Sequence, residues 1–161
     1  KSNGLTFLNK NKNFFDLILI KQTIHLLKMN EITKLINLCK KSLKSKGVIV
    51  VLTLDPNKNE IPTFKLMNTK LENSLNRDKK IITLLKKNNK VLKVKNFSYK
   101  VKILKSKYLQ MNNDKYISIL LDFDLNQIKE GINEIDLNFK KRITFNDKLQ
   151  CIIISKIDQK I

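Results

Sequence analysis

Two short, nearly continuous apolar runs stand out in the first third of the chain. Residues 15–20 are apolar except for Asp16, and residues 48–54 are rich in β-branched side chains. Runs of this length without polar alternation are typical of parallel strands that are covered on both faces. We therefore predict buried strands at 15–20 and at 48–54.

The segment between these strands has the spacing of an amphipathic helix. Its apolar positions fall three or four residues apart and form one face: Ile32, Leu35, Ile36, Cys39 and Leu43. Asn30 is the predicted N-cap, with Glu31 near the positive helix end, and Gly47 is the predicted C-cap. Residues 21–29 are expected to form a connection or a short helical turn. A strand, a helix and a strand in this order predict parallel pairing with a right-handed crossover.

The middle of the chain is more polar and its pattern is weaker. We expect residues 57–78 to be irregular, because no apolar periodicity is evident there. Residues 79–88 have the spacing of a short amphipathic helix. Apolar and lysine residues alternate over 92–103, which predicts a strand or a bent pair of strands.

The last third contains a helix signal followed by strand signals. Asp124 and Gln127 have the spacing of a capping box, and the apolar residues that follow, up to Ile135, lie on one helix face. Residues 142–156 are expected to form either a long strand or a hairpin. In the second case Asn146 and Asp147 would supply the turn.

Composition indicates one globular domain over residues 1–161. The hydrophobic fraction is 42%, and a chain of 161 residues can enclose a single modest core. No apolar run reaches the roughly 18–20 residues of a membrane span, and no signal peptide is evident, so we expect an intracellular, cytoplasmic protein. Cys39 and Cys151 lie among apolar residues and are expected to be buried, reduced thiols. No Cys/His cluster occurs, so we predict no metal site.

The formal net charge of +19 raises the question of nucleic-acid binding. The excess is almost entirely lysine, whereas only Arg77 and Arg142 are arginine, and nucleic-acid interfaces favour arginine and aromatic residues. The many Lys, Asn and Ile residues and the absence of alanine are typical of codon usage in an AT-rich genome. We therefore expect only weak, nonspecific contact with nucleic acid.

Three segments, in order, carry a family resemblance. They read FDLILIKQTIHLL, then LKSKGVIVVLTLDP, then SILLDFDLNQIKEGINEI with ITFNDKLQCIIISK. This ordered set resembles the class I S-adenosylmethionine-dependent methyltransferases. The resemblance implies an α/β fold with a Rossmann-like mixed sheet and an antiparallel last strand. It also implies S-adenosylmethionine as the cofactor.

Two other signatures of that family do not occur in the chain. One is the glycine-rich turn after the first strand, and the other is the acidic residue that ends the second strand and binds the ribose. The three glycines are Gly4, Gly47 and Gly131, and no G-x-G is formed. Because the chain also begins with lysine, we predict that it is the C-terminal half of a methyltransferase domain. The strand at 15–20 would then be a hydrophobic sheet edge, which favours a dimer or pairing with the missing N-terminal half.

The resemblance implies a set of cofactor-binding residues. Asn3, Gly4 and Leu5 match a loop that packs beside the adenine, although an acidic residue is more usual at the position of Asn3. Lys21 and Gln22 end the first strand, where ligands bind in open α/β sheets. The alternative for these last two residues is a solvated strand end without a binding role.

Three further residues are candidates for the chemistry. His25, the only histidine, is predicted to accept a proton during methyl transfer, or else to be structural. Asp55 is a candidate substrate contact, or else an ordinary turn residue before Pro56. Tyr108 precedes the last helix, where the family builds a lid over the acceptor, or else it packs in the core.

The function that the resemblance implies is methyl transfer from S-adenosylmethionine. The strand after Asp16 does not end in the Asn/Asp-Pro-Pro-aromatic signature of many enzymes that methylate nucleic-acid amino groups, so we expect a small-molecule acceptor. The alternative is a noncatalytic basic module, for nucleic-acid binding or assembly, on a partial Rossmann-like scaffold. Cofactor binding separates the two.

Overall fold

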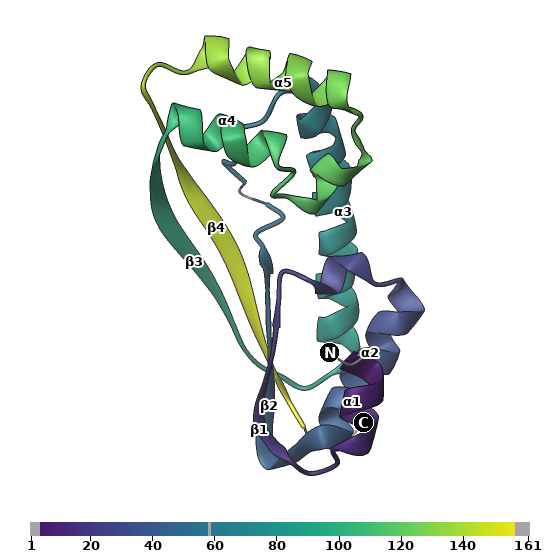
Figure 1. Ribbon diagram of the computed structural model, residues 1–161. Helices are drawn as coiled ribbons and strands as arrows, with labels where there is room; N and C mark the ends of the chain where they lie inside the picture. The colour runs from purple at the N-terminus through teal and green to yellow at the C-terminus, as the bar shows by residue number, and fades with distance from the viewer. Residues whose placement is uncertain (1–3, 58, 157–161) are drawn as a thin grey trace. The chain divides into compact units, whose positions relative to one another are not determined.

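The computed structural model describes residues 4–57 and 59–156, and shows an α/β protein (Figure 1). The elements, in chain order, are α1 (Gly4–Lys10), β1 (Phe15–Lys21), the short 3-10 helix η1 (Ile24–Leu26), α2 (Met29–Ser42), β2 (Leu43–Leu54), α3 (Lys65–Asn88), β3 (Val91–Leu104), α4 (Lys105–Asn113), the 3-10 helix η2 (Ser118–Asp122), α5 (Leu125–Asn138) and β4 (Arg142–Ser155). The predicted helical turn within 21–29 is η1, and the prediction is confirmed.

The chain divides into two compact units. Unit 1 comprises Lys1–Asp55, Arg77–Phe97 and Leu149–Ile161, and unit 2 comprises Pro56–Asn76 and Ser98–Lys148. Three elements, α3, β3 and β4, contribute residues to both units.

The four strands form one mixed sheet in the order β1-β2-β4-β3. β1 and β2 are parallel, with Ile18 opposite Ile49 and Ile20 opposite Val51. The last strand, β4, is antiparallel to β2, with Ile49 opposite Ile154. The predicted α/β class, the parallel crossover and the antiparallel last strand are all confirmed.

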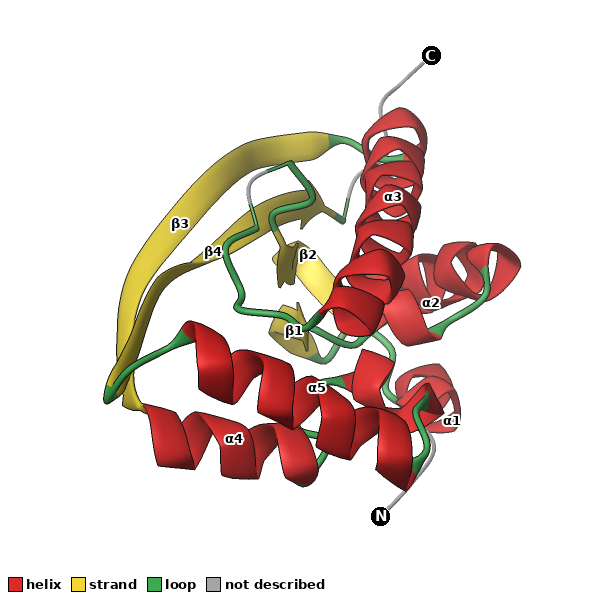
Figure 2. Cartoon of the chain, turned by 90° about the horizontal axis from the view of Figure 1, so that it is seen from above, coloured by secondary structure: helices red, strands yellow, loops and turns green. Residues whose placement is uncertain are grey.

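Helices of unit 1 cover one face of its strands. Seen from above, α2 and the second half of α3 lie on the same side of β1 and β2 (Figure 2). Alternate strand residues enter the resulting core, among them Ile20, Ile49 and Val51. Cys39 and Cys151 are both buried free thiols, as predicted. Burial raises the pKa of the Cys39 thiol to about 12, so this thiol stays protonated.

β1 is the edge of the sheet, and its opposite face is open. Leu17 and Leu19 point away from the helices and are 54% and 55% exposed. The prediction of a strand covered on both faces is therefore wrong for β1. The prediction that this segment forms a hydrophobic edge is confirmed.

Gly47 does not cap the helix. α2 ends at Ser42, and Gly47 lies inside β2 without a positive φ. A Cβ at this position would lie 2.9 Å from Leu43 Cδ2 and 3.0 Å from the backbone oxygen of Phe15. The pairing of β1 with β2 shifts register here, so Gly47 serves a close backbone approach at an irregularity in the sheet.

The start of α2 also differs from the prediction. The N-cap is Lys28, not Asn30, and the Lys28 N–H donates to the carboxylate of Glu31 at 2.7 Å. The expected position of Glu31 near the positive helix end is confirmed.

At α5 the predicted capping box is confirmed, because Gln127 N–H donates to Asp124 and Asp124 N–H donates to the Gln127 side chain.

Residues 65–78, expected to be irregular, belong to the long helix α3. The buried residues Met67, Leu71 and Leu75 are four apart, and Ile82 and Leu85 continue the same face. Each turn of this part of α3 buries only one apolar residue among several polar ones. The apolar repeat is therefore too weak to be recognised in a short stretch of sequence. β3 is a single strand, and β4 is the long strand of the two alternatives, without a turn at Asn146.

Unit 2 has its own core beneath two neighbouring helices, α4 and α5 (Figures 1 and 2). Phe64, Tyr108 and Ile128 are among its large, fully buried side chains. Gly131 of α5 packs directly on the ring of Phe64, because a Cβ there would lie 2.5 Å from the ring carbons. A glycine at this position lets the helix approach the ring.

Candidate functional site

The carboxyl ends of β1 and β2 lie side by side in unit 1. Lys21 is opposite Leu52, and the N–H of Gln22 donates to the Leu52 oxygen at 2.7 Å. Gln22 has a φ of 49°, which is uncommon for a residue other than glycine and marks a sharp turn out of the strand. Lys21 and Gln22 are both exposed. Their side chains are thus available to a ligand at the edge where open α/β sheets bind them.

His25 lies in η1, just after that turn, and is half-buried. Burial, and after it the positive charge of Arg77, lowers the pKa of the His25 imidazole. The imidazole is therefore neutral at neutral pH, which is the form that can accept a proton.

Arg77 fixes the segment that follows η1. Its Nη2 donates to the backbone oxygen of Leu27 at 2.5 Å, and this contact joins α3 to the end of the β1–α2 connection. The guanidinium itself is exposed. Arg77 thus acts on His25 in two ways, through its charge and through the backbone that it holds.

Asp78, the next residue of α3, is buried and hydrogen-bonds with Thr53 near the end of β2. Burial raises the pKa of the Asp78 carboxyl to about 6, and the charge of Arg77 and the Thr53 hydrogen bond oppose this shift. The Oδ1 atom of Asp78 is buried and has no hydrogen-bond partner. Such a group is a functional-site candidate, because its protonation state changes near neutral pH.

Sequence reasoning missed Thr53, Arg77 and Asp78. The segment 57–78 was expected to be irregular, so neither Arg77 nor Asp78 was placed on a helix facing the strand ends. One signal could have found Arg77, because it is one of only two arginines among 33 basic residues. Thr53 could have been found as the single hydroxyl residue within the apolar run 48–54.

The predicted adenine-side residues lie at the start of α1. Asn3 lies outside the described residues. Gly4 is the first residue of α1. A Cβ at this position would meet no atom within 4 Å, so the packing of the protein does not require glycine there. Leu5 is half-buried. The cofactor-binding role of these residues stays a prediction.

The two predicted substrate contacts belong to different units. Asp55 follows β2 in unit 1 and is buried. Tyr108 lies in unit 2, where it is also buried; its hydroxyl donates to the Pro62 oxygen at 2.7 Å and accepts from Tyr116 at 3.1 Å. Tyr108 thus holds the chain between β2 and α3, and a substrate contact by either residue stays a prediction.

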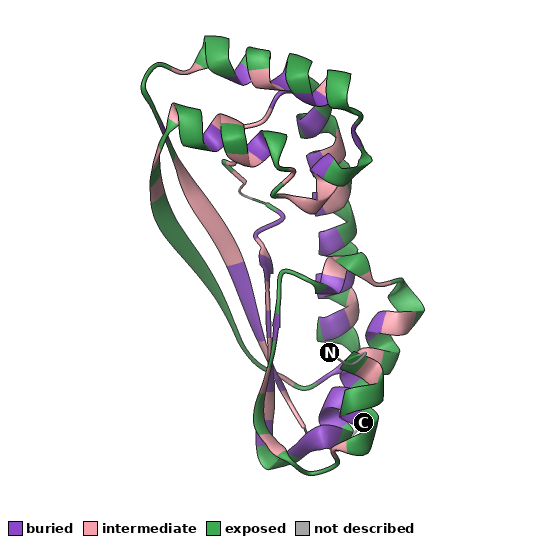
Figure 3. Cartoon of the chain, in the orientation of Figure 1, coloured by how far each residue is buried: buried purple, intermediate pink, exposed green. Residues whose placement is uncertain are grey.

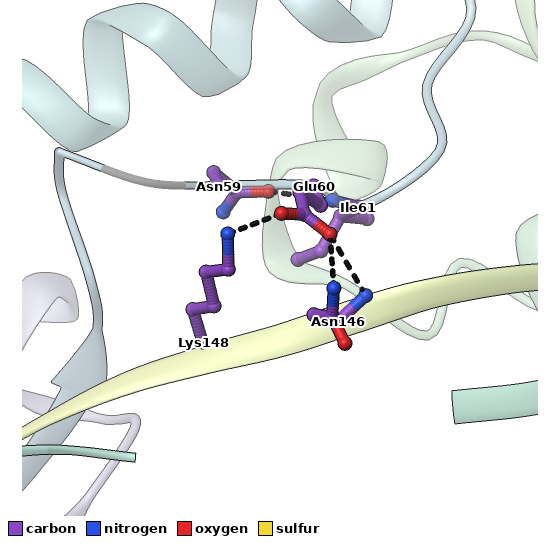
Figure 4. A network of polar contacts seen from close by, with 5 residues as sticks. All are labelled: Asn59, Glu60, Ile61, Asn146 and Lys148. Carbon is purple, nitrogen blue, oxygen red and sulfur yellow. Dashed lines mark hydrogen bonds and ion pairs between the residues drawn. The ribbon is translucent and has the colours of Figure 1, made fainter. Parts of the chain in front are cut away.

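The same connection is held a second time in unit 2, by Glu60 (Figure 4). Its carboxylate pairs with Lys148 and accepts hydrogen bonds from the Asn146 backbone at 3.1 Å and side chain at 2.7 Å. The hydrogen bonds from Lys148 and Asn146 lower the pKa of Glu60. Glu60 and Tyr108 together fasten residues 60–62 within unit 2.

The described residues would supply only part of the predicted cofactor site. Gly47 and Gly131 are used for close packing within the protein, and Gly4 is followed directly by helix, so no glycine forms an open, backbone-lined cradle. A pocket between α2 and the end of α3 encloses about 30 Å³ beside Ile36 and Leu85. This is far below the roughly 300–1,000 Å³ of ligand sites. The strand-end residues fit the polar side of a ligand, whereas the glycine cradle is not among the residues described.

The described part of the chain shows neither a metal-binding cluster nor a membrane-spanning helix. No three His, Cys, Asp or Glu residues between positions 4 and 156, leaving out 58, are grouped as a metal site would require. None of the described helices combines the length and the apolar character needed to cross a membrane.

No family model and no curated protein matches this chain. Among solved structures, a SAM-dependent methyltransferase from Archaeoglobus fulgidus is 17% identical with a TM-score of 0.46, and the match covers 96% of this chain and 66% of that one. The MccD protein is 12% identical with a TM-score of 0.47, covering 91% of this chain and 63% of that one.

A third structure, Haemonchus contortus phosphoethanolamine N-methyltransferase 2 in complex with S-adenosyl-L-methionine, is 9% identical with a TM-score of 0.40, covering 90% of this chain and 34% of that one. The chain spans about two thirds of the length of the first two structures. These likenesses concern fold alone.

Proposed function

We propose that this chain is part of an S-adenosylmethionine-dependent methyltransferase that acts on a small molecule. The observation that carries the proposal is the position of a neutral histidine at the joined carboxyl ends of β1 and β2. The sequence pattern of the methyltransferase family leads to the same strand end. The mixed sheet with its antiparallel last strand is consistent with that pattern.

His25 is the residue proposed to accept a proton from the methyl acceptor. Methyl transfer is a direct displacement, so the protein contributes mainly by aligning the reactants, and a base is needed only where the acceptor carries a proton. Half-burial keeps the imidazole partly accessible, and the nearby guanidinium of Arg77 disfavours the protonated form. Lys21 and Gln22, both exposed at the carboxyl end of β1, would contact cofactor or acceptor.

The rest of the cofactor site would come from outside the described residues. The open edge and face of β1, with Leu17 and Leu19, support pairing with a further segment or a second copy. An N-terminal half that adds a strand to β1 would pair with its open backbone edge, and an element of that half packed on the open face would cover Leu17 and Leu19. It would also bring a glycine-rich turn to the carboxyl ends of the strands.

Calorimetric titration of the protein isolated from its source with S-adenosylmethionine tests the proposal. We expect saturable binding that is nearly unchanged in a His25→Gln variant, because His25 serves the acceptor and not the cofactor. Absence of binding in the source protein would refute the proposal. The assembly-module alternative predicts that same absence, together with a stable complex formed through β1.

A further inference from the structure

Strand β3 carries an exposed row of cations and aromatic rings. β3 is the second edge of the sheet, and it is exposed along nearly all of its length (Figure 3). Alternate residues of a strand point to the same face, about 6.6 Å apart, so Lys93, Lys95, Phe97 and Tyr99 share one side of this single strand. Phe97 is 51% exposed and Tyr99 is 72% exposed.

The opposite side of β3 faces a different neighbour. Asn96 accepts a hydrogen bond from Gln150 of β4 at 3.1 Å, and Gln150 is buried. The Asn96 side chain therefore lies on the inner side of the strand. The four residues named above lie on the outer side, where their side chains are open to a partner.

The charge around this row has one sign. The sequence contains no Asp or Glu between Asp78 and Asp114, whereas lysines recur throughout that stretch. Neither Lys93 nor Lys95 forms an ion pair with a described residue. The charge of this strand therefore favours an anionic partner. A second copy of this chain, with its net charge of +19, is disfavoured.

Lysines alone would have a simpler explanation, because edge strands commonly carry them to prevent aggregation. The two exposed rings do not serve that purpose, since an exposed aromatic pair makes an edge more adhesive. Two lysines followed by two exposed rings on one side of a strand suit single-stranded nucleic acid, whose bases stack on aromatic rings while its phosphates lie beside cations.

We propose that the outer side of β3 is a docking strand for single-stranded nucleic acid. Phe97 and Tyr99 stack on successive bases, and Lys93 and Lys95 contact the phosphates that precede them. This binding is independent of the methyltransferase proposal. It requires no base-specific contact, so it is tolerant of sequence.

Fluorescence anisotropy with a labelled oligothymidine strand tests the proposal on the full chain. Phe97→Leu and Tyr99→Leu should each weaken binding about tenfold, because each removes one stacking ring. The matched control is Phe14→Leu, which removes a ring that is 61% exposed at the opposite edge of the sheet. That change should leave the affinity unaltered.

The salt dependence gives a second, independent readout. Replacing Lys93 and Lys95 by Gln should reduce the slope of log affinity against log salt by about 0.7 for each phosphate that is no longer neutralised. Lys86→Gln with Lys87→Gln, in the last turn of α3, is the charge-matched control and should change the slope less. Equal effects of the ring variants and Phe14→Leu, or equal slopes for the two lysine pairs, would overturn the proposal. So would binding of anionic phosphatidylserine vesicles through these residues without binding of the oligonucleotide.

Discussion

Arg77 donates a hydrogen bond to the backbone oxygen of Leu27 at 2.5 Å, two residues beyond His25. The contact ties α3 to the segment that carries the only histidine of the chain. Its charge also lies close enough to lower the pKa of that histidine, as a second cause after burial. Arg77 is therefore a positioning residue for His25.

Replacing Arg77 by Gln should raise the pKa of His25, while burial keeps it below its usual value of about 6.5. The imidazole C2 proton can be followed by NMR without assignment, because no other histidine is present. Arg77→Lys keeps the charge and should leave the pKa nearly unchanged. Arg142→Gln, the matched control in unit 2, should have no effect, and an equal rise in both Gln variants would contradict the role of Arg77.

Asp78 should make the stability of the protein depend on pH. Its pKa is raised to about 6 in the folded state, so the folded protein takes up a proton that the unfolded chain does not as pH falls below 6. This stabilises the fold by roughly 1.4 kcal/mol at pH 5 relative to pH 8. Above pH 6 the buried Asp78 carboxylate is charged and destabilises the folded state. This destabilisation disappears as the carboxyl is protonated at lower pH.

An Asp78→Asn variant isolates this contribution. The lowered pKa of His25 acts in the opposite direction, because the unfolded chain binds its proton more readily than the folded chain as pH falls. His25 is present in both proteins, so its effect cancels in the difference. Urea unfolding at pH 5 and pH 8 should show that the wild type gains stability relative to Asp78→Asn at the lower pH; a difference that does not change with pH would contradict the shift.

Gly131→Ala should destabilise unit 2. The new Cβ would lie 2.5 Å from the ring of Phe64, which is buried and cannot turn away without disturbing its neighbours. Overpacking of this kind costs about 1–3 kcal/mol, which exceeds the roughly 1 kcal/mol that alanine gains in a helix. Urea unfolding measures the loss. Gly4→Ala, where a Cβ would meet nothing within 4 Å, should be neutral or stabilising.

Much of unit 1 could be predicted because its signals are local. The apolar run before Lys21 and the β-branched run ending at Leu54 identify two strands, and helical spacing identifies α2 between them. Asp124 with Gln127 likewise identifies the start of α5. Each of these signals arises within a few residues of the element that it predicts.

What could not be predicted depends on long-range contacts. The sequence pattern predicts Gly47 as a helix cap. In the structure a glycine is needed there because the backbone oxygen of Phe15, on the neighbouring strand, lies too close for a Cβ. Thr53 and Asp78 are 25 positions apart, and only the packing of α3 against β2 brings them together. The sequence therefore predicted the strand end and His25 as parts of the candidate site. It did not predict Arg77 and Asp78, the two charged residues that α3 adds to the site.

Leu17→Lys combined with Leu19→Lys should reduce self-association. Both leucines lie on the uncovered face of the edge strand, and charges there oppose pairing with another strand. Sedimentation velocity should show larger species for the parent chain than for the variant. Leu137→Lys changes a leucine that is 86% exposed on α5 and is the control; an identical shift in this variant would mean that net charge, and not the β1 edge, governs association.

The most direct measurement of the central claim is the His25 NMR signal of the protein isolated from its source during titration with S-adenosylmethionine. A ligand bound at the carboxyl ends of β1 and β2 lies close to the imidazole, so we predict a saturable change in the chemical shift and pKa of His25. Saturable binding by calorimetry without any change at His25 would place the cofactor elsewhere. An unchanged signal and no binding at all would contradict the methyltransferase account.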